Sequence, residues 1–215
     1  MDEFKFRKRR KALADELREK GIQDEHVLKA IGTIPRHVFV DSAFANRAYE
    51  DSALPIAMKQ TISQPYTVAR QTELLEVKPG EKILEIGSGS GYQGAVLLEM
   101  GAKLYTIERH DELHHRARQI LSKLGYRAMF KCGDGTQGWN AYAPWDGIVV
   151  TAGAPVIPEA LRNQLADGGR LVIPVGDSST QSMVRIIREG DQFTEEHYDN
   201  FKFVPLIGKN GWNDS

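Results

Sequence analysis

Residues 82–107 read KILEIGSGSGYQGAVLLEMGAKLYTI, and this stretch decides the fold class. A short apolar strand, a glycine-rich turn, a helix and a second apolar strand follow one another within it. Short apolar strands that alternate with helices are typical of parallel β-strands joined by right-handed crossover helices. The stretch therefore predicts an α/β protein with a doubly wound, mostly parallel sheet.

The alternation of strands and helices continues towards the C-terminus. We expect helices over residues 111–125 and 157–169, the second with a glycine stop, and strands over residues 128–132, 146–150 and 170–176. Two further strands, over residues 183–189 and near residues 199–208, follow without an intervening helix. They predict an antiparallel edge on the otherwise parallel sheet.

The segment before residue 79 has a different character. We expect two helices separated at Gly21, an extended loop over residues 51–65 and a helix over residues 66–77. The sequence shows no linker and no internal repeat. Residues 1–215 are therefore predicted to form a single domain, with added N-terminal helices and a substrate loop in residues 1–78 and the α/β core with its C-terminal strands in residues 79–215.

The composition is that of an ordinary globular protein. Of the 215 residues, 41% are hydrophobic and 27% are charged, and the formal net charge is -1, so no overall field attracts nucleic acid or a membrane surface. The charged N-terminus has no apolar stretch of the length that a signal peptide or a membrane span needs. A single cysteine, Cys132, cannot form an internal disulfide, which favours a reducing compartment. We expect a cytoplasmic protein.

The glycine-rich turn lies where a sheet of this kind binds its ligand. Gly87, Gly89 and Gly91 fall between a predicted strand and its helix, at the carboxyl edge of the sheet. Glycine allows a tight turn and a close approach of the backbone to a ligand. From Gly89 the residues GSGYQG also match the GxGxxG pattern of dinucleotide-binding proteins, so the glycines alone leave a nicotinamide or flavin enzyme open.

Three acids at successive strand ends favour a different cofactor. Glu85, two residues before the turn, is expected beside the ligand, where its carboxylate would repel pyrophosphate but attract the ammonium and sulfonium cations of S-adenosyl-L-methionine. Glu108 ends the next strand, 17 positions after Gly91, where an acid can accept hydrogen bonds from ribose hydroxyls. Asp134 follows the third strand between two glycines, and its carboxylate and neighbouring amides can bind adenine. Together the acids predict S-adenosyl-L-methionine.

The order of the motifs resembles the protein-L-isoaspartate O-methyltransferase family from about residue 35 to residue 206. The most specific segment is QTISQP, residues 60–65. The segments LEIGSGSGYQ, TIER, GDG, APWDGIVVTAGAP, QLADGGRLVIPVG and FVPL follow in the family's order. The resemblance implies a Rossmann-like S-adenosylmethionine-dependent methyltransferase fold.

The resemblance also implies an activity and its site. The family methylates the free α-carboxylate of L-isoaspartyl residues in damaged proteins and peptides, which leads through a succinimide to normal aspartate. The serine of TISQP, here Ser63, is implied as the catalytic residue. The candidate substrate contacts next to it are Thr61, Ile62 and Gln64. The implied and candidate cofactor contacts are Glu85, Gly87, Ser88, Gly89, Gly91, Glu108, Asp134 and Gly135.

The chemistry of the acceptor sets the expected role of Ser63. A carboxylic acid with an unperturbed pKa near ~4 is ionised at neutral pH and needs no general base. Alignment of the acceptor oxygen with the methyl group should therefore dominate the catalysis. We expect the hydroxyl of Ser63 to position the acceptor.

Other classes of function stay open on the sequence alone. They are another S-adenosylmethionine enzyme acting on small molecules or nucleic acid, a dehydrogenase, and a non-catalytic adenosine-binding module. After the fourth strand the chain has Thr151-Ala152-Gly153-Ala154 instead of an Asn-Pro-Pro-Tyr-type amine-binding motif, which speaks against methylation of bases. We expect isoaspartyl proteins and peptides as partners and no nucleic acid.

The sequence predicts no metal site, no contact from the C-terminal tail to the functional site and no oligomer. No metal is predicted, because Cys132 stands alone and the neighbouring His114 and His115 are expected to face solvent from a charged helix. The tail after Leu206 is shorter than in other family members, so no contact from Ile207 or Trp212 to the site is predicted. A monomer is expected, because a damaged segment on another protein needs an open cleft.

Overall fold

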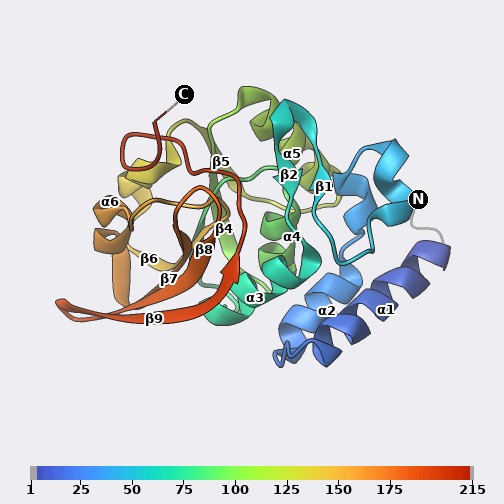
Figure 1. The fold of residues 1–215 in the computed structure, drawn as a ribbon, viewed down its shortest axis with the longest axis horizontal. Coiled ribbons are helices and arrows are strands. Elements are labelled where there is room, and N and C mark those ends of the chain that lie inside the picture. Colours follow the sequence, from blue (N-terminus) through green and yellow to red (C-terminus); the bar gives the residue numbers. More distant parts are fainter. Residues whose placement is uncertain (1–3, 214–215) are drawn as a thin grey trace.

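The central element of the fold is a twisted β-sheet. The computed structural model describes residues 4–213, and in this part of the chain seven strands pair in the order β5-β4-β3-β6-β7-β8-β9 (Figure 1). The strands are β3 (Lys82–Ile86), β4 (Lys103–Glu108), β5 (Met129–Cys132), β6 (Trp145–Val150), β7 (Leu165–Gly176), β8 (Gln181–Glu189) and β9 (Gln192–Phe201).

The pairing confirms the predicted fold class. Strands β5, β4, β3, β6 and β7 run parallel, whereas β8 is antiparallel to both of its neighbours, β7 and β9. The three C-terminal strands thus form the predicted antiparallel edge. Because β3 pairs with β4 on one side and with β6 on the other, the strand order reverses at β3, which is where open α/β sheets bind ligands.

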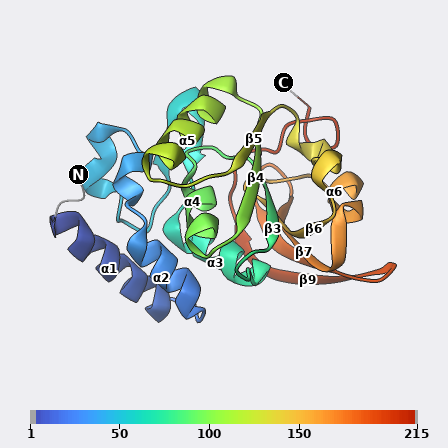
Figure 2. The ribbon, with the colours of Figure 1, turned by 180° about the vertical axis from the view of Figure 1, so that it is seen from behind.

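Helices cover both faces of the sheet. One hydrophobic cluster joins the apolar sides of α3 (Pro65–Leu75), α4 (Tyr92–Glu99) and α5 (Asp111–Lys123) to the N-terminal helices and to one face of the sheet. A second cluster packs the short α6 (Glu159–Asn163) against the opposite face. In the view from behind, α4 and α5 lie on one side of β4 and β5, and α6 lies on the other side of the sheet (Figure 2). The first cluster runs from Phe6 to Met183, so side chains from both parts of the chain share one core.

Two predicted elements near the C-terminus are wrong. The predicted helix over residues 157–169 is only Glu159–Asn163, and β7 already begins at Leu165. Leu165 pairs with Trp145 and Arg170 with Gly147, so residues 166–169 bulge out of the strand and the glycines serve that bulge. The last strand, predicted near residues 199–208, is β9 at Gln192–Phe201, and the segment after it crosses the carboxyl edge of the sheet.

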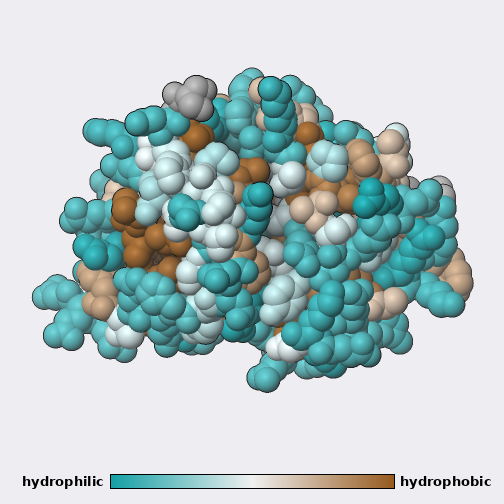
Figure 3. Space-filling view, in the orientation of Figure 1, coloured by the Kyte–Doolittle hydropathy of each residue, from teal (hydrophilic) through white to brown (hydrophobic). Residues whose placement is uncertain are grey.

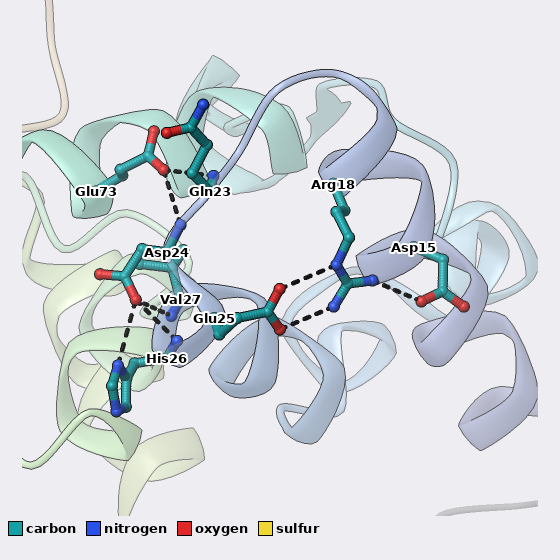
Figure 4. A network of polar contacts seen from close by, with 8 residues as sticks. All are labelled: Asp15, Arg18, Gln23, Asp24, Glu25, His26, Val27 and Glu73. Carbon is teal, nitrogen blue, oxygen red and sulfur yellow. Dashed lines mark hydrogen bonds and ion pairs between the residues drawn. The ribbon is translucent and has the colours of Figure 1, made fainter.

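The two N-terminal helices lie at the end of the molecule opposite β9 (Figures 1 and 2). They are α1 (Phe4–Glu19) and α2 (Glu25–Thr33). Figure 4 shows the polar contacts that fix them. Arg18 at the end of α1 pairs with Glu25 at the start of α2 (2.9 Å). Glu73 of α3 accepts hydrogen bonds from the backbone amides of Gln23 (2.7 Å) and Asp24 (3.0 Å). Asp24 in turn caps α2 by accepting from the amide of His26 (2.8 Å). The turn between α1 and α2 is thereby tied to α3.

The loop expected over residues 51–65 contains a small hairpin. Strand β1 (Leu54–Pro55) pairs with β2 (Thr61–Ile62), and the 3₁₀ turn η3 (Ala57–Lys59) joins them with positive φ at Met58 (58°) and Lys59 (56°). Two further 3₁₀ turns, η1 (Arg36–Phe39) and η2 (Ser42–Arg47), lead into it. The chain leaves the hairpin at β2 and enters α3, whose first residue is Pro65.

The surface of the molecule is predominantly hydrophilic. On the face in Figure 3, hydrophilic side chains surround smaller hydrophobic patches. Within residues 4–213, no helix is both long enough and apolar enough to cross a membrane.

Candidate functional site

A pocket opens at the carboxyl edge of the sheet, above the point where the strand order reverses. Its walls come from the ends of β3, β4 and β6, from the starts of α4 and α5, from the β2 hairpin and from the segment after β9. The lining residues are Gln60, Thr61, Ile62, Ser63, Val68, Ile86, Gly87, Ser88, Gly89, Ser90, Tyr92, Gln93, Ile107, Glu108, Arg109, His110, Leu113, Gly135, Thr151, Ala152, Val204, Pro205, Leu206 and Ile207.

The glycine-rich turn forms one wall of this pocket through Gly87, Ser88, Gly89 and Ser90. Gly87, Gly89 and Gly91 have φ values of +95°, +50° and +89°, a backbone conformation that costs glycine little. At Gly87 a Cβ atom would lie 2.5 Å from the hydroxyl oxygen of Thr151. Gly91 does not line the pocket; its amide closes the turn by donating to the carbonyl of Ser88 (2.7 Å). These glycines allow the backbone to lie directly under a ligand.

Glu108 binds the turn from the neighbouring strand. One carboxylate oxygen accepts the amide of Gly89 (2.9 Å) and the other accepts the amide of His110 (3.0 Å), and the side chain is buried. Each carboxylate oxygen keeps a further acceptor site. Glu108 therefore holds the turn in place and still has capacity to accept hydrogen bonds from hydroxyl groups in the pocket.

Glu85 does not lie where the sequence suggested. Its side chain is 1% exposed, does not line the pocket and packs beneath the turn, where Thr106 donates to it (2.6 Å) and is itself 2.8 Å from the hydroxyl of Ser88. Burial raises the pKa of Glu85 to about 8, against the hydrogen bond from Thr106, which lowers it. Glu85 is therefore linked to the pocket by hydrogen bonds through Thr106 and Ser88, and it also interacts electrostatically with Glu108.

Asp134 contacts the C-terminal tail instead of the main pocket. Its carboxylate accepts hydrogen bonds from the amide of Thr136 (2.9 Å), the hydroxyl of Thr136 (2.7 Å) and the amide of Lys209 (2.9 Å). Burial alone would raise the pKa of Asp134, but these bonds lower it below its ordinary value. The next residue, Gly135, does line the main pocket.

The tail reaches the site, contrary to expectation. Ile207 lines the main pocket, and the indole nitrogen of Trp212 donates to the carbonyl of Gly153 (3.0 Å) at the carboxyl edge of the sheet. The tail is short, but it turns back on itself through a bridge between Ile207 and Trp212 and so stays next to Asp134.

Ser63 lies where two pockets meet. The second pocket lies along the segment that follows β9 and is lined by Ala53, Thr61, Ser63, Gln64, Tyr66, Thr67, Thr151, Ser179, Thr180, Asp199, Asn200, Phe201, Lys202, Phe203 and Val204. The residues common to both pockets are Thr61, Ser63, Thr151 and Val204. Within residues 4–213 the hydroxyl of Ser63 has no hydrogen-bond partner, and the adjoining helix α3 has no side-chain cap, so this hydroxyl is available to a ligand.

The other candidate substrate contacts divide between the two pockets. Thr61 lines both, the buried Ile62 lines only the first, and Gln64 lines only the second, where its amide donates to Asp51 (3.0 Å).

Sequence reasoning missed several polar residues of the first pocket, among them Thr151 and Gln93. Thr151 follows β6 and donates to the carbonyl of Gly87 (2.6 Å); the strand-end reasoning applied to the acids would have found it. Gln93 is buried on α4, donates to Thr72 (2.8 Å) and leaves its side-chain carbonyl oxygen without a partner. No sequence signal separates Gln93 from an ordinary helix glutamine.

The histidines and the cysteine give no candidate metal centre. Among residues 4–213, no group of three His, Cys, Asp or Glu side chains is close enough together to hold a metal ion. His115 is exposed as expected, but His114 is buried, 8% exposed, with its ring edge-on to Phe130. The expectation that both face solvent is wrong for His114, because it lies on the side of α5 that packs inward with Leu113 and Ala117.

Sequence comparisons agree on one family. The family model "Protein-L-isoaspartate(D-aspartate) O-methyltransferase (PCMT)" matches residues 8–211. Proteins named protein-L-isoaspartate O-methyltransferase from Cytophaga hutchinsonii and Salinibacter ruber are 53% and 54% identical to this chain. The alignments cover 99% and 96% of this chain and 96% and 94% of those proteins. These matches exclude the dehydrogenase function that the GxGxxG pattern had left open.

Solved structures show the same fold. A structure named protein-L-isoaspartate O-methyltransferase superposes with a TM-score of 0.85 at 28% identity, covering 94% of this chain and 67% of the other. A Plasmodium falciparum structure in complex with S-adenosyl-L-homocysteine has a TM-score of 0.78 at 24% identity, with coverage of 92% and 98%. With the family model spanning nearly the whole chain and relatives above 50% identity, the chain belongs to the protein-L-isoaspartate(D-aspartate) O-methyltransferase family.

Proposed function

We propose that this chain transfers the methyl group of S-adenosyl-L-methionine to the free α-carboxylate of L-isoaspartyl residues in damaged proteins and peptides. The resulting ester returns through a succinimide to normal aspartate. One observation carries the proposal: the pocket above the glycine turn and the open pocket beside β9 meet at Ser63. A cofactor in the first pocket and a peptide in the second would have their reacting groups at that junction.

The residues of the first pocket fit the proposed cofactor. Ile86, Ile107 and Leu113 provide apolar walls for an adenosyl group, and Glu108 offers the acceptor sites that ribose hydroxyls need. The unpartnered side-chain oxygen of Gln93 is a buried acceptor on the same pocket and suits a cationic ammonium group. When bound, S-adenosyl-L-methionine supplies an electrophilic methyl group on a sulfonium, which an ionised carboxylate can attack directly.

The second pocket supports a peptide acceptor and the role of Ser63. An isoaspartyl α-carboxylate is ionised at neutral pH, so the protein has to orient it and exclude water from it, without removing a proton. The free hydroxyl of Ser63 can donate one hydrogen bond to an acceptor oxygen, and Thr61 lies beside it on the rim of both pockets. The backbone of β2 and α3 on either side of Ser63 keeps that hydroxyl in place.

The decisive experiment uses paired peptides. The enzyme is incubated with methyl-labelled S-adenosyl-L-methionine and two peptides that differ only in an aspartyl or an isoaspartyl linkage. We expect base-labile label on the isoaspartyl peptide alone, because a methyl ester is hydrolysed by base and an N-methyl group is not. Equal labelling of both peptides, or none of either, would refute the proposal.

A Ser63→Ala variant separates an enzyme from a binding module. It should bind S-adenosyl-L-homocysteine as the wild type does, because the substitution leaves Glu108 and the glycine turn unchanged. Turnover of the isoaspartyl peptide should fall by about 10- to 100-fold, the size of effect expected when a group that aligns the acceptor is removed. Unchanged turnover in Ser63→Ala would show that Ser63 has only a structural role.

We further propose that the chain works as a monomer in the cytoplasm, with isoaspartyl proteins and peptides as substrates and no nucleic-acid partner. The net charge of -1 and the single cysteine support these assignments. Light scattering at several protein concentrations tests the monomer, and a mass that rises with concentration would contradict it.

A further inference from the structure

A fully buried arginine lies directly behind the segment that carries Ser63. Arg36, the first residue of η1, has 0% exposure and does not line either pocket. Its Nη2 donates to the carbonyl of Ser63 (2.9 Å) and lies 3.4 Å from the carbonyl of Ser52. Arg36 is therefore a direct hydrogen-bond partner of Ser63 from behind, on the backbone, while the hydroxyl of Ser63 faces the pockets.

The same guanidinium also contacts the cofactor side of the site. Its central carbon lies 4.6 Å from the ring centroid of Tyr92, a cation–π arrangement. Tyr92 is the first residue of α4, follows the glycine turn directly and lines the first pocket. Arg36 thus binds the acceptor segment through Nη2 and lies over the ring of Tyr92 at the start of the helix that follows the cofactor turn.

Stability alone does not account for an arginine at this position. Its Nε and Nη1 are buried and have no hydrogen-bond partner, and desolvation lowers the pKa of Arg36. The nearby carboxylate of Asp51 is already engaged by Lys20 (2.6 Å), the side chain of Gln64 (3.0 Å) and the amide of Tyr66 (2.8 Å). A buried charge with incomplete compensation is often no more stabilising than an apolar side chain of the same volume. A role in aligning the site explains why this residue is an arginine.

Asp51 completes the support of the segment from the other side. It holds the side chain of Gln64 and the amide of Tyr66, so it fixes the two residues that flank Pro65. Arg36 and Asp51 together bind three positions of the acceptor segment and its helix start: the Ser63 carbonyl, the Gln64 amide group and the Tyr66 amide. Of the two, only Arg36 also reaches α4.

We propose that Arg36 is a positioning residue for methyl transfer: by binding the Ser63 carbonyl while stacking on Tyr92, it fixes the Ser63 hydroxyl relative to the glycine turn. This rests on the proposed function. A displacement of the acceptor by about 1 Å can cost on the order of 100-fold in rate. Loss of Arg36 should therefore impair turnover without impairing the binding of cofactor product.

The test compares Arg36→Met and Arg36→Lys with a matched control, Arg170→Met. Arg170 is also buried with an unpartnered Nε, but it pairs with Glu81 (2.6 Å) at the opposite end of the sheet. We expect kcat on the isoaspartyl peptide to fall about 30-fold or more in Arg36→Met, with the Kd for S-adenosyl-L-homocysteine within threefold of wild type. Arg36→Lys should recover part of this loss, because it can still donate to Ser63, and Arg170→Met should leave kcat unchanged.

A double-mutant cycle distinguishes alignment from general loosening. If Arg36 acts through the Ser63 hydroxyl, Arg36→Met should cost much less in a Ser63→Ala background than in the wild type. Equal losses in both backgrounds, or a kcat within threefold of wild type in Arg36→Met, would overturn the inference. If Arg36→Met does not fold, Arg36→Lys takes its place in the cycle, because it keeps the buried charge but loses the planar face on Tyr92.

A readout without catalysis keeps this inference separate from the proposed function. Should the wild type leave the isoaspartyl peptide unlabelled, the proposed function fails. Amide hydrogen exchange of residues 61–64 then decides the structural part: Arg36→Met should accelerate it at least tenfold and Arg170→Met should not. Equal exchange in both variants would overturn the assignment of Arg36 as the anchor of this segment.

Discussion

Replacing Glu108 by glutamine tests how the site holds its cofactor. In the wild type, the two carboxylate oxygens accept one backbone amide each, from Gly89 (2.9 Å) and from His110 (3.0 Å). A glutamine has one acceptor oxygen and one NH2 group, so one of these two buried amides loses its partner. That loss destabilises the fold by about 1–3 kcal/mol.

The same substitution should weaken cofactor binding. A hydrogen bond to a charged acceptor contributes about 1.5–3 kcal/mol, and each 1.4 kcal/mol is roughly tenfold in affinity. With the turn less firmly held and the charge at the ribose position removed, we expect Glu108→Gln to raise the Kd for S-adenosyl-L-homocysteine by about 10- to 100-fold. Isothermal titration calorimetry measures the Kd, and urea unfolding without ligand measures the stability.

Glu81→Gln is the matched control for Glu108→Gln. Glu81 also accepts a backbone amide, from Lys78 (2.9 Å), and pairs with Arg170, but it lies at the opposite end of the sheet from the pocket. Its one amide oxygen can keep both hydrogen bonds, so the variant loses the charge of the ion pair with Arg170 but should lose no affinity. A Kd for Glu108→Gln within threefold of wild type, or an equal loss of affinity in Glu81→Gln, would refute the role given to Glu108.

Three further substitutions test the surroundings of the turn. Because Glu85 has a pKa of about 8 in the folded protein and an ordinary pKa near 4.5 when unfolded, the folded state binds the extra proton and stability falls as pH rises between these values. Thermal melts should show a Tm advantage of Glu85→Gln over wild type that grows from pH 5 to pH 8; a constant difference would contradict it. Gly94→Ala places a Cβ 2.8 Å from Leu104 and 3.1 Å from Glu85, and should lower the free energy of unfolding in urea by about 1–3 kcal/mol. In the control Gly32→Ala the nearest atom is 3.7 Å from the new Cβ, so the free energy of unfolding should not fall. Asp134→Ala removes the acceptor for the Lys209 amide, so hydrogen exchange at that amide should rise about tenfold, and unchanged exchange would show that the tail is held elsewhere.

The sequence was sufficient for the fold class, a mostly parallel sheet with an antiparallel edge, and for the place of the turn between β3 and α4. Apolar strands and helices of ordinary length alternate from residue 82 onward, so local pattern and final topology agree. The pattern failed where tertiary contacts decide. Residues 166–169 have helix-ending glycines, but they form a bulge because Leu165 already pairs with Trp145. Strand β9 is an edge strand exposed to solvent, so half of its residues are polar. The alternation of apolar and polar residues that indicates a strand is therefore hard to recognise in its sequence.

The site residues divide in the same way. Strand-end reasoning gave Gly87 and Glu108, and the family resemblance gave Ser63; the structure has all three in the lining of one pocket. Strand-end reasoning misplaced Glu85, because alternation along a strand gives the face and not the partner, and Thr106 and the close approach of Gly94 keep this carboxylate below the turn. Arg36 carried no signal at all, since its contacts to Ser63 and Tyr92 span 27 and 56 positions of sequence.

The absence of charge at the junction of the two pockets fits the proposed reaction. Thr61, Ser63, Thr151 and Val204 are shared by both pockets and none is ionisable at neutral pH. Transfer of a methyl group from a sulfonium to a carboxylate consumes one positive and one negative charge, so the charge separation shrinks towards the transition state. A cationic side chain in direct contact with the acceptor would stabilise its ground state more than the transition state and slow the reaction.

A hydroxyl avoids this cost, because it orients the acceptor with one hydrogen bond and leaves most of the negative charge on the attacking oxygen. The buried cation Arg36 donates to the Ser63 carbonyl and does not line either pocket, so it can align the site without forming an ion pair with the substrate. Bringing a guanidinium into the junction, as in Thr61→Arg, should therefore tighten the apparent binding of the isoaspartyl peptide while lowering kcat. Steady-state kinetics that showed a higher kcat in this variant would contradict the neutral-junction explanation.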